Sequence, residues 1–203
     1  MEIMTTRVAT PEDIPGIVDT ITSAFFDDPL WAPVFPDPAQ RAAQSAELWR
    51  LSVTSALRYP WTLATENLES VAVWIPPEGS ELTDDEAAGL DAFLVDLVGR
   101  TAADSILALY DEFERATPAE PHFYLSLLGT HDRHRGRGLG MNLLRDSLAR
   151  IDELGAPAYL ESSNPANNAR YQSVGFRPVG EFVAPKGQVV TTMWRDASGT
   201  VAT

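Results

Sequence analysis

A glycine-rich basic stretch, residues 131–140 with the sequence HDRHRGRGLG, has the composition of a phosphate-binding turn. It follows an apolar run, residues 122–128, and precedes a helical pattern, so we expect a strand, a turn and a helix N-terminus. The first turn of a helix offers unpaired N–H groups and the positive end of the dipole, and glycines let a phosphate approach closely. The stretch therefore predicts an anion site. Arg133, Arg135 and Arg137 would add charge, although a solvated basic turn is the simpler alternative for them.

The charge of this stretch contrasts with that of the whole chain. The 203 residues carry a formal net charge of −14, which disfavours a binder of nucleic acids or anionic membranes because both partners require a basic surface. An anionic ligand would need a local basic site, and residues 131–137 form the only dense basic cluster. The acidic remainder suits a cationic partner.

The residue types that are scarce also exclude some chemistry. The chain has no cysteine, which excludes disulfides, thiolate zinc sites and a cysteine nucleophile. The three histidines, His122, His131 and His134, are too few and too clustered for most metal sites, so we expect no metal. No apolar run reaches transmembrane length and the N-terminus lacks a signal-peptide pattern. We therefore expect a cytoplasmic protein.

The hydrophobic pattern predicts the elements that position the glycine turn. Composition and length indicate one α/β domain over residues 1–203, with a frayed tail at 197–203. The expected strands are residues 5–9, 61–65, 70–75, 122–128, 158–162, 177–182 and 188–194. The expected helices are residues 10–27, 39–59, 83–99, 101–115, one that follows the glycine turn and ends at Gly155, and 166–173.

Two of these helices are expected within the segment 78–121, between adjacent strands. A capping box at residues 83–86 (TDDE) begins the first helix and Gly99 ends it. Such a pair could cap one side of a site, or it could simply cover an edge of the sheet.

An aromatic loop precedes the second helix. Residues 30–38 contain Trp31, Phe35 and three prolines, which stiffen the loop and would set large aromatic groups near the surface. The loop either lines a pocket or forms a hydrophobic lid over the core.

Two motifs, in a fixed order, resemble those of the GCN5-related N-acetyltransferase (GNAT) family. The family's acetyl-CoA motif is R or Q, two residues, G, one residue, and G or A. Its matching residues are Arg135, Gly138 and Gly140. The second motif is an Asn followed by a helix that ends in Tyr, three residues and Gly-Phe. Its matching residues are Asn164, Tyr171, Gly175 and Phe176. The C-terminal half is most similar to puromycin N-acetyltransferase-like members, whereas the N-terminal half resembles them less closely.

The resemblance implies a fold and a reaction. The fold would be a single GNAT domain, a mixed central β-sheet flanked by helices, with a two-helix insertion before the cofactor-binding strand. The reaction would transfer an acetyl group from acetyl-CoA to a primary amine of a small molecule, by direct attack in a ternary complex. The protein would be a monomer or homodimer. The alternatives are a protein lysine or N-terminal acetyltransferase and a non-catalytic acyl-CoA-binding module.

The resemblance also assigns residues to acetyl-CoA. Backbone groups at the end of the strand would hold the pantetheine arm, the glycine turn would hold the pyrophosphate, and two asparagines would assist or merely cap a helix. These residues are Leu128, Gly129, Thr130, Arg135, Gly136, Arg137, Gly138, Leu139, Gly140, Asn164 and Asn167.

Two side chains are implied to carry the chemistry. Tyr171 would be the general acid that protonates the leaving thiolate, unless it only packs on the preceding strand. Glu161, at the end of its strand, is the best candidate to receive the amine proton or to bind a cationic acceptor, although it could be a solvated edge charge. Phe26 and Trp31 are expected to line the acceptor site together with Glu161.

Overall fold

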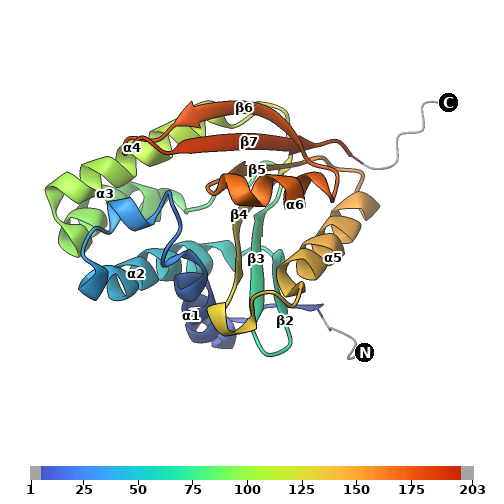
Figure 1. Cartoon of the computed structure of the whole chain (residues 1–203), viewed down its shortest axis with the longest axis horizontal. Coiled ribbons are helices and arrows are strands. Elements are labelled where there is room, and N and C mark those ends of the chain that lie inside the picture. The colour runs from blue at the N-terminus through green and yellow to red at the C-terminus, as the bar shows by residue number, and fades with distance from the viewer. Residues whose placement is uncertain (1–5, 198–203) are drawn as a thin grey trace.

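The computed structural model describes residues 6–197 of the chain and contains one mixed seven-stranded sheet (Figure 1). The strand order is β1-β2-β3-β4-β5-β7-β6, and all neighbouring strands are antiparallel except β4 and β5. The strands are β1 (Thr6–Val8), β2 (Thr62–Thr65), β3 (Ser70–Ile75), β4 (Phe123–Thr130), β5 (Ala158–Ser162), β6 (Arg177–Val183) and β7 (Val189–Arg195). Thr5 and the predicted tail beyond Ala197 lie outside the described residues.

Helices cover both faces of the sheet. They are α1 (Ile14–Phe25), α2 (Pro38–Ala56), α3 (Asp84–Val98), α4 (Arg100–Ala116), α5 (Leu139–Glu153) and α6 (Asn168–Gln172), with short 3-10 turns at Pro11–Asp13, Ala32–Val34, Asp132–His134 and Pro165–Asn167. In Figure 1, α1 to α3 lie on one side of the central strands and α5 lies on the other. This is the predicted fold class, a mixed sheet flanked by helices.

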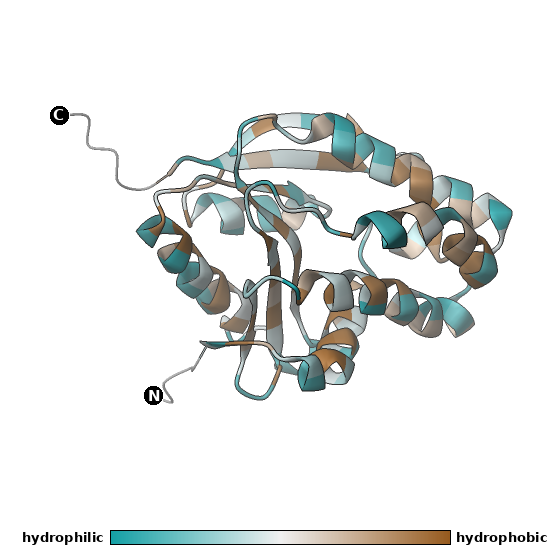
Figure 2. Ribbon diagram, turned by 180° about the vertical axis from the view of Figure 1, so that it is seen from behind, coloured by the Kyte–Doolittle hydropathy of each residue, from teal (hydrophilic) through white to brown (hydrophobic). Residues whose placement is uncertain are grey.

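The alternation of side chains along β3 divides the core between these two faces. Val71 and Val73 belong to the cluster formed with α1, α2, α3 and α4, whereas Ala72 and Trp74 belong to the cluster formed with α5. All four are buried because successive side chains of a strand point to opposite faces, and here both faces are covered. The central strands are accordingly hydrophobic along their length, whereas the helices are mixed (Figure 2).

The two helices predicted between neighbouring strands are α3 and α4, which connect β3 to β4. The capping box is present, since the Thr83 hydroxyl accepts the Glu86 N–H at 3.3 Å and the Glu86 carboxylate accepts the Thr83 N–H at 2.8 Å. Gly99 separates α3 from α4 with a φ of 79°, a conformation that favours glycine. Both helices contribute to the core cluster of α1 and α2.

The aromatic loop differs from the prediction. Trp31 and Phe35 are 7% and 1% exposed, so these side chains are not near the surface. The Trp31 ring packs edge-on against Trp49 of α2, with 4.8 Å between ring centroids. Prolines and aromatic residues were typical of an exposed loop, but the burial of indole surface against α2 and α4 outweighs that local tendency.

The strands β4 and β5 diverge. They pair in parallel only at Phe123 with Ala158 and at Tyr124 with Tyr159, although β4 continues to Thr130 and β5 to Ser162. On its other side, β4 remains paired with β3 as far as Thr130. The second half of β4 therefore lacks a strand partner on the β5 side, which opens the sheet at its centre.

Candidate active site

The glycine turn has the backbone that its sequence predicted. Gly136 and Gly138 both have a φ of 77°, in the left-handed region that side-chain-bearing residues rarely adopt. Gly138 is the N-cap of α5, and the first bond into the helix runs from Asn142 N to Gly138 O at 3.0 Å. The N–H groups of Leu139, Gly140 and Met141 are therefore the unpaired donors of a helix N-terminus.

Space around the turn also fits an anion. A Cβ placed on Gly136 or Gly138 would meet no atom within 4 Å, so their backbone is open. Gly140 is different, because a Cβ there would lie 2.8 Å from the Thr130 hydroxyl oxygen. Gly140 thus lets the start of α5 pack directly on the end of β4, which places the helix N-terminus beside the diverging strands.

Two arginine side chains of the turn have partners within the chain. Arg135 donates to the carbonyls of Ser23 and Ala24, at 3.4 and 2.8 Å, near the end of α1. The Arg137 guanidinium lies 3.1 Å from the His134 ring. The expectation that Arg135 adds charge for a phosphate stays a prediction, and the structure gives this side chain a further role. Its side chain fastens the turn to α1, because the helix C-terminus has carbonyls without intrahelical partners.

The end of β4 contains the residues expected to hold the pantetheine arm. Leu128, Gly129 and Thr130 lie on the half of the strand that has no β5 partner. Gly129 is required for packing, since a Cβ there would lie 2.9 Å from Ile21 and Ala24 of α1. The Thr130 hydroxyl lies 3.0 Å from that of Ser70, so its side chain is engaged within the sheet and its backbone is what remains for a ligand.

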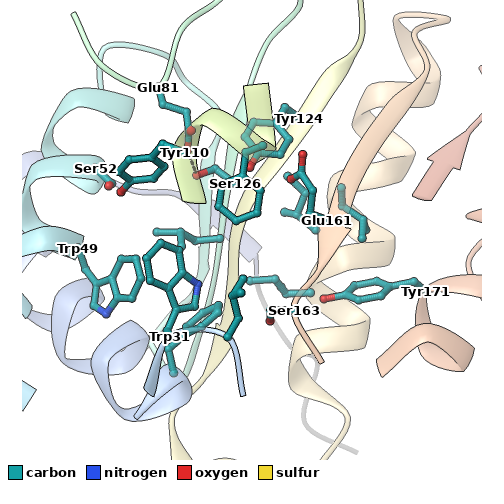
Figure 3. A pocket seen from close by; sticks show the side chains of 17 residues that line it. Trp31, Trp49, Ser52, Glu81, Tyr110, Tyr124, Ser126, Glu161, Ser163 and Tyr171 are labelled. Carbon is teal, nitrogen blue, oxygen red and sulfur yellow. Dashed lines mark hydrogen bonds between the residues drawn. The ribbon is translucent and has the colours of Figure 1, made fainter. Parts of the chain in front are cut away.

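A small cavity of about 60 Å³ lies where β4 and β5 diverge (Figure 3). Aromatic and carboxylate side chains from both halves of the chain surround it. Its lining residues are Phe25, Leu30, Trp31, Trp49, Ser52, Glu81, Tyr110, Phe113, Tyr124, Leu125, Ser126, Leu127, Leu128, Leu160, Glu161, Ser163 and Tyr171. The cavity thus brings together both residues expected to carry the chemistry, Tyr171 and Glu161.

Tyr171 points its phenol toward this cavity from α6 (Figure 3). Its ring packs edge-on against Phe176, with 6.2 Å between centroids, which holds it on the short helix. Burial raises the pKa of Tyr171 to about 12, with a smaller contribution from the Asp28 carboxylate. The phenol therefore stays protonated at neutral pH and is able to donate.

Glu161, on β5, also lines this cavity. Its Oε1 atom is buried and has no hydrogen-bond partner among the described residues. Burial raises the pKa of Glu161 to about 8, partly offset by the phenols of Tyr124 and Tyr159 and reinforced by the negative charge of Glu81. A buried acceptor without a donor is costly, so this atom is suited to a cationic or N–H-bearing ligand.

The sequence reasoning missed Glu81, which follows β3 in the segment that leads to α3. Ser126 of β4 donates its hydroxyl to Glu81 Oε1, and burial raises the pKa of this second carboxyl. Tyr110 and Tyr124, which also line the cavity, have pKa values raised by burial and by these carboxylates. No local motif identified Glu81, since one Glu in a Pro- and Gly-containing loop carries no periodic signal.

Asp28 and Ser163 are further residues that the sequence did not single out. The Ser163 hydroxyl donates to Asp28 Oδ2 at 2.7 Å and so ties the aromatic loop to the end of β5. The same carboxylate accepts the Leu30 and Trp31 N–H groups, at 2.9 and 3.2 Å. Burial raises the Asp28 pKa, and the hydrogen bonds oppose that change.

Of the remaining residues expected to bind the acceptor or acetyl-CoA, some line the cavity and others do not. Trp31 lines the cavity, but Phe26 does not, because its ring lies 5.2 Å from the Arg41 guanidinium; the adjacent Phe25 lines the cavity instead. Asn164 caps the short turn before α6 by accepting the Ala166 N–H at 3.0 Å. Asn167 accepts from Arg170 at 3.2 Å. In this structure, Asn164 therefore acts as a local helix cap.

Among residues 6–197, no group of three or more His, Asp or Glu side chains could hold a metal ion, and no helix is long and apolar enough to cross a membrane.

The site thus combines a diverging parallel strand pair with a glycine turn at a helix N-terminus, and its cavity is lined by a phenol and a carboxylate. Residues 106–196 match the family model described as an acetyltransferase (GNAT) domain. That family uses acetyl-CoA as its co-substrate. The chain has the GNAT fold, as the resemblance predicted, and its C-terminal part resembles an acetyltransferase domain.

Solved structures show the same fold over nearly the whole chain. An acetyltransferase from Corynebacterium glutamicum, described as histone acetyltransferase HPA2 and related acetyltransferase, is 27% identical and superposes with a TM-score of 0.74, covering 98% of this chain and 100% of that one. An agmatine N-acetyltransferase is 15% identical, with a TM-score of 0.68 and coverage of 96% and 100%. The Drosophila melanogaster polyamine N-acetyltransferase is 17% identical, with a TM-score of 0.63 and coverage of 96% and 100%.

Proposed function

We propose that this protein transfers the acetyl group of acetyl-CoA to the primary amine of a small molecule, by direct attack in a ternary complex. The observation that carries the proposal is the cavity at the divergence of β4 and β5, which is lined by both Tyr171 and Glu161. An acid and a base that line one cavity are what an acyl transfer from a thioester to an amine requires.

The chain offers a fitting cradle for acetyl-CoA. The N–H groups at the start of α5 and the open backbone of Gly136 and Gly138 would bind the pyrophosphate. Backbone groups of residues 128–130, which have no β5 partner, would hold the pantetheine arm and direct the thioester to the cavity. A backbone N–H of β4 facing the thioester would stabilise the oxyanion as the amine attacks.

Two proton transfers complete the reaction. The amine nitrogen forms a bond to the thioester carbonyl carbon, and Glu161 receives the proton that the nitrogen loses, directly or through water. As the carbon–sulfur bond breaks, Tyr171 donates its proton to the thiolate sulfur, and the products are the N-acetylated acceptor and CoA. The elevated pKa of Glu161 suits it to accept a proton near neutral pH.

The acceptor side of the cavity favours a cation. Its lining includes Glu81 and Glu161 and contains no Lys or Arg. The net charge of −14 would also attract a cationic acceptor. Agmatine and polyamines, the substrates named for two structural neighbours, are cations of this kind. The likeness to puromycin N-acetyltransferase-like members stays a prediction of the C-terminal half.

The test is release of CoA from acetyl-CoA with the purified protein and a panel of arylalkylamines, polyamines, aminoglycosides, aminonucleosides, amino acids and lysine peptides. We expect turnover with at least one small amine and slower turnover with peptides. Turnover confined to peptides would assign the protein to lysine or N-terminal acetylation. Binding of acetyl-CoA without CoA release from any member would favour a non-catalytic binding module.

A further inference from the structure

A second, larger hollow of about 680 Å³ adjoins the catalytic cavity, and none of residues 128–140 line it. Its walls come from α2, the segment between β3 and α3, α4, the segment between α4 and β4, and the start of β4. Its volume falls in the range typical of small-molecule sites. We call it the outer groove.

The two hollows share a boundary. Five residues line both the outer groove and the inner cavity: Ser52, Glu81, Tyr110, Phe113 and Tyr124. An acceptor that enters through the groove must therefore pass Glu81 and two phenols before it reaches Glu161. Figure 3 shows Glu81, Tyr110 and Tyr124 on the same side of the cavity, above the buried tryptophans.

The walls of the outer groove combine apolar surface with negative charge. Aliphatic and aromatic side chains from α2, α3, α4 and the β3–α3 segment form most of it. These are Leu48, Leu51, Ile75, Leu82, Leu90, Tyr110, Phe113 and Tyr124. Four carboxylates also line it, Glu78, Glu81, Glu114 and Glu120, and it contains no Lys or Arg. The surface is complementary to an apolar body that carries a positive charge.

Glu81 differs from the other three carboxylates. It is the only one of them that also lines the inner cavity, and Ser126 of β4 fixes it there by donating a hydroxyl to Oε1. Glu114 and Glu120 are exposed on the outer side. A desolvated carboxylate next to Glu161 has no compensating cation within the described cavity lining, which is an arrangement suited to an incoming ammonium group.

We infer that Glu81 is an acceptor-binding residue, and that the acceptor is a primary amine with a bulky apolar or aromatic body. The ammonium group passes Glu81 to reach Glu161, while the body stays in the outer groove against α2 and α4. This inference rests on the proposed function and names the substrate class for its acceptor side. It distinguishes such amines from polyamines, which have no bulky apolar body to pack against the aliphatic and aromatic walls.

The experiment compares tryptamine with ethylamine, which has the same reactive group and no body to fill the groove. Wild type is expected to have a KM for tryptamine lower by about tenfold or more, because apolar surface is buried only with the larger amine. If the KM for ethylamine or spermidine is at or below that for tryptamine, the inference that the acceptor has a bulky apolar body is overturned. Leu51→Gln, in the wall of the groove, should raise the KM for tryptamine and leave that for ethylamine unchanged.

Glu81→Gln tests the charge, since glutamine keeps the shape and still accepts the Ser126 hydroxyl proton. We expect the KM for both amines to rise about tenfold or more, as for the loss of a charged hydrogen bond, while the KM for acetyl-CoA and the melting temperature stay unchanged. Glu153→Gln is the matched control, because it removes one exposed carboxylate at the end of α5, outside the groove. An unchanged amine KM in Glu81→Gln overturns the inference.

Two further measurements keep the test decisive. If Glu81→Gln folds poorly, Ser126→Ala is the alternative variant, because it keeps Glu81 and removes only the hydroxyl that holds it. We expect a smaller rise in the KM for the amine in Ser126→Ala. An unchanged KM in that variant would count against the inference. If wild type releases no CoA with any amine, the proposed function fails. Calorimetric binding of tryptamine in the presence of CoA, weakened by Glu81→Gln, would still support the acceptor site, and equal binding would reject it.

Discussion

The two sides of the candidate active site are built in different ways. On the cofactor side, backbone groups of one continuous segment, from the end of β4 through the glycine turn to the start of α5, form the proposed cradle. On the acceptor side, side chains from the aromatic loop, α2, the segment before α3, α4, β4 and β5 converge on one cavity. A backbone site depends on glycines, whereas a side-chain site depends on tertiary packing. Substitutions on the two sides should therefore have separable effects.

The largest expected effect is at Tyr171, where both sides meet. Tyr171→Phe keeps the ring against Phe176 and removes only the proton that the thiolate is expected to receive. We expect kcat to fall by about a hundredfold, as is typical of losing a general acid, with little change in either KM. Steady-state kinetics with saturating acetyl-CoA measures this, and Tyr59→Phe is a control phenol, since Tyr59 accepts the Ser80 N–H and does not line the cavity. Unchanged kcat in Tyr171→Phe would remove the assignment.

Glu161→Gln should have the next largest effect, and it depends on pH. Since the pKa of Glu161 is raised to about 8, only the deprotonated fraction of wild type can accept a proton, and kcat/KM should rise with pH through that value. The variant should lose about tenfold or more at high pH and show a flatter profile. An equal loss at every pH would indicate that Glu161 positions the amine and is not the base.

Glu161→Gln should also change how the free energy of unfolding depends on pH. The pKa of Glu161 is raised from 4.5 to about 8 on folding, so between these values the folded state binds more protons than the unfolded state. The free energy of unfolding therefore falls as the pH rises through this window. Glu161→Gln removes that contribution, and its stability should fall less between pH 5 and pH 8 than that of wild type, as measured by urea denaturation. Glu81 and Asp28, whose pKa values are also raised, would keep some pH dependence in the variant.

The cofactor side can be tested with a pair of glycines that share one conformation. Gly138 and Gly155 have φ values of 77° and 62°, and a Cβ on either would meet no atom within 4 Å. Alanine should therefore cost a similar free energy of unfolding at both, about 1 kcal/mol. Only Gly138→Ala should weaken acetyl-CoA binding, by about tenfold, because the N–H groups of its turn would shift. Calorimetry that gave both variants wild-type affinity would argue against the pyrophosphate site.

The same contrast explains how much could be predicted from the sequence. Strands and helices were placed within a few residues, and β3 and β5 at their observed bounds, because two-residue alternation, the capping box and glycine termini are local signals. The glycine turn and the motif that contains Tyr171 could also be found, because the residues of each lie close together along the sequence. Glu81, Tyr110 and Tyr124 could not be found this way, because each is an ordinary residue until the fold places it beside Glu161.

For the arginines, the local signal was incomplete. Composition grouped Arg133, Arg135 and Arg137 as charges for a phosphate, but the carbonyls at the end of α1 are brought to Arg135 only by the tertiary packing of α1 against β4. No spacing rule connects residue 135 with residues 23 and 24. The charge of a motif is thus less informative than its backbone conformation, which the glycines specify directly.

The smallest expected effect follows from the hydrogen bonds of Arg135 to α1. Arg135→Ala should lower the free energy of unfolding by about 1 kcal/mol, because two partly exposed hydrogen bonds to the Ser23 and Ala24 carbonyls are lost. Arg133→Ala is the control, since it removes an equal charge from an exposed position of the same turn and should leave stability nearly unchanged. Urea denaturation measures both variants, and calorimetry with acetyl-CoA at two salt concentrations separates the roles. If Arg135→Ala reduces the salt dependence of binding more than Arg133→Ala and leaves stability intact, the side chain contacts the phosphate after all, and the cofactor side is not built from backbone alone.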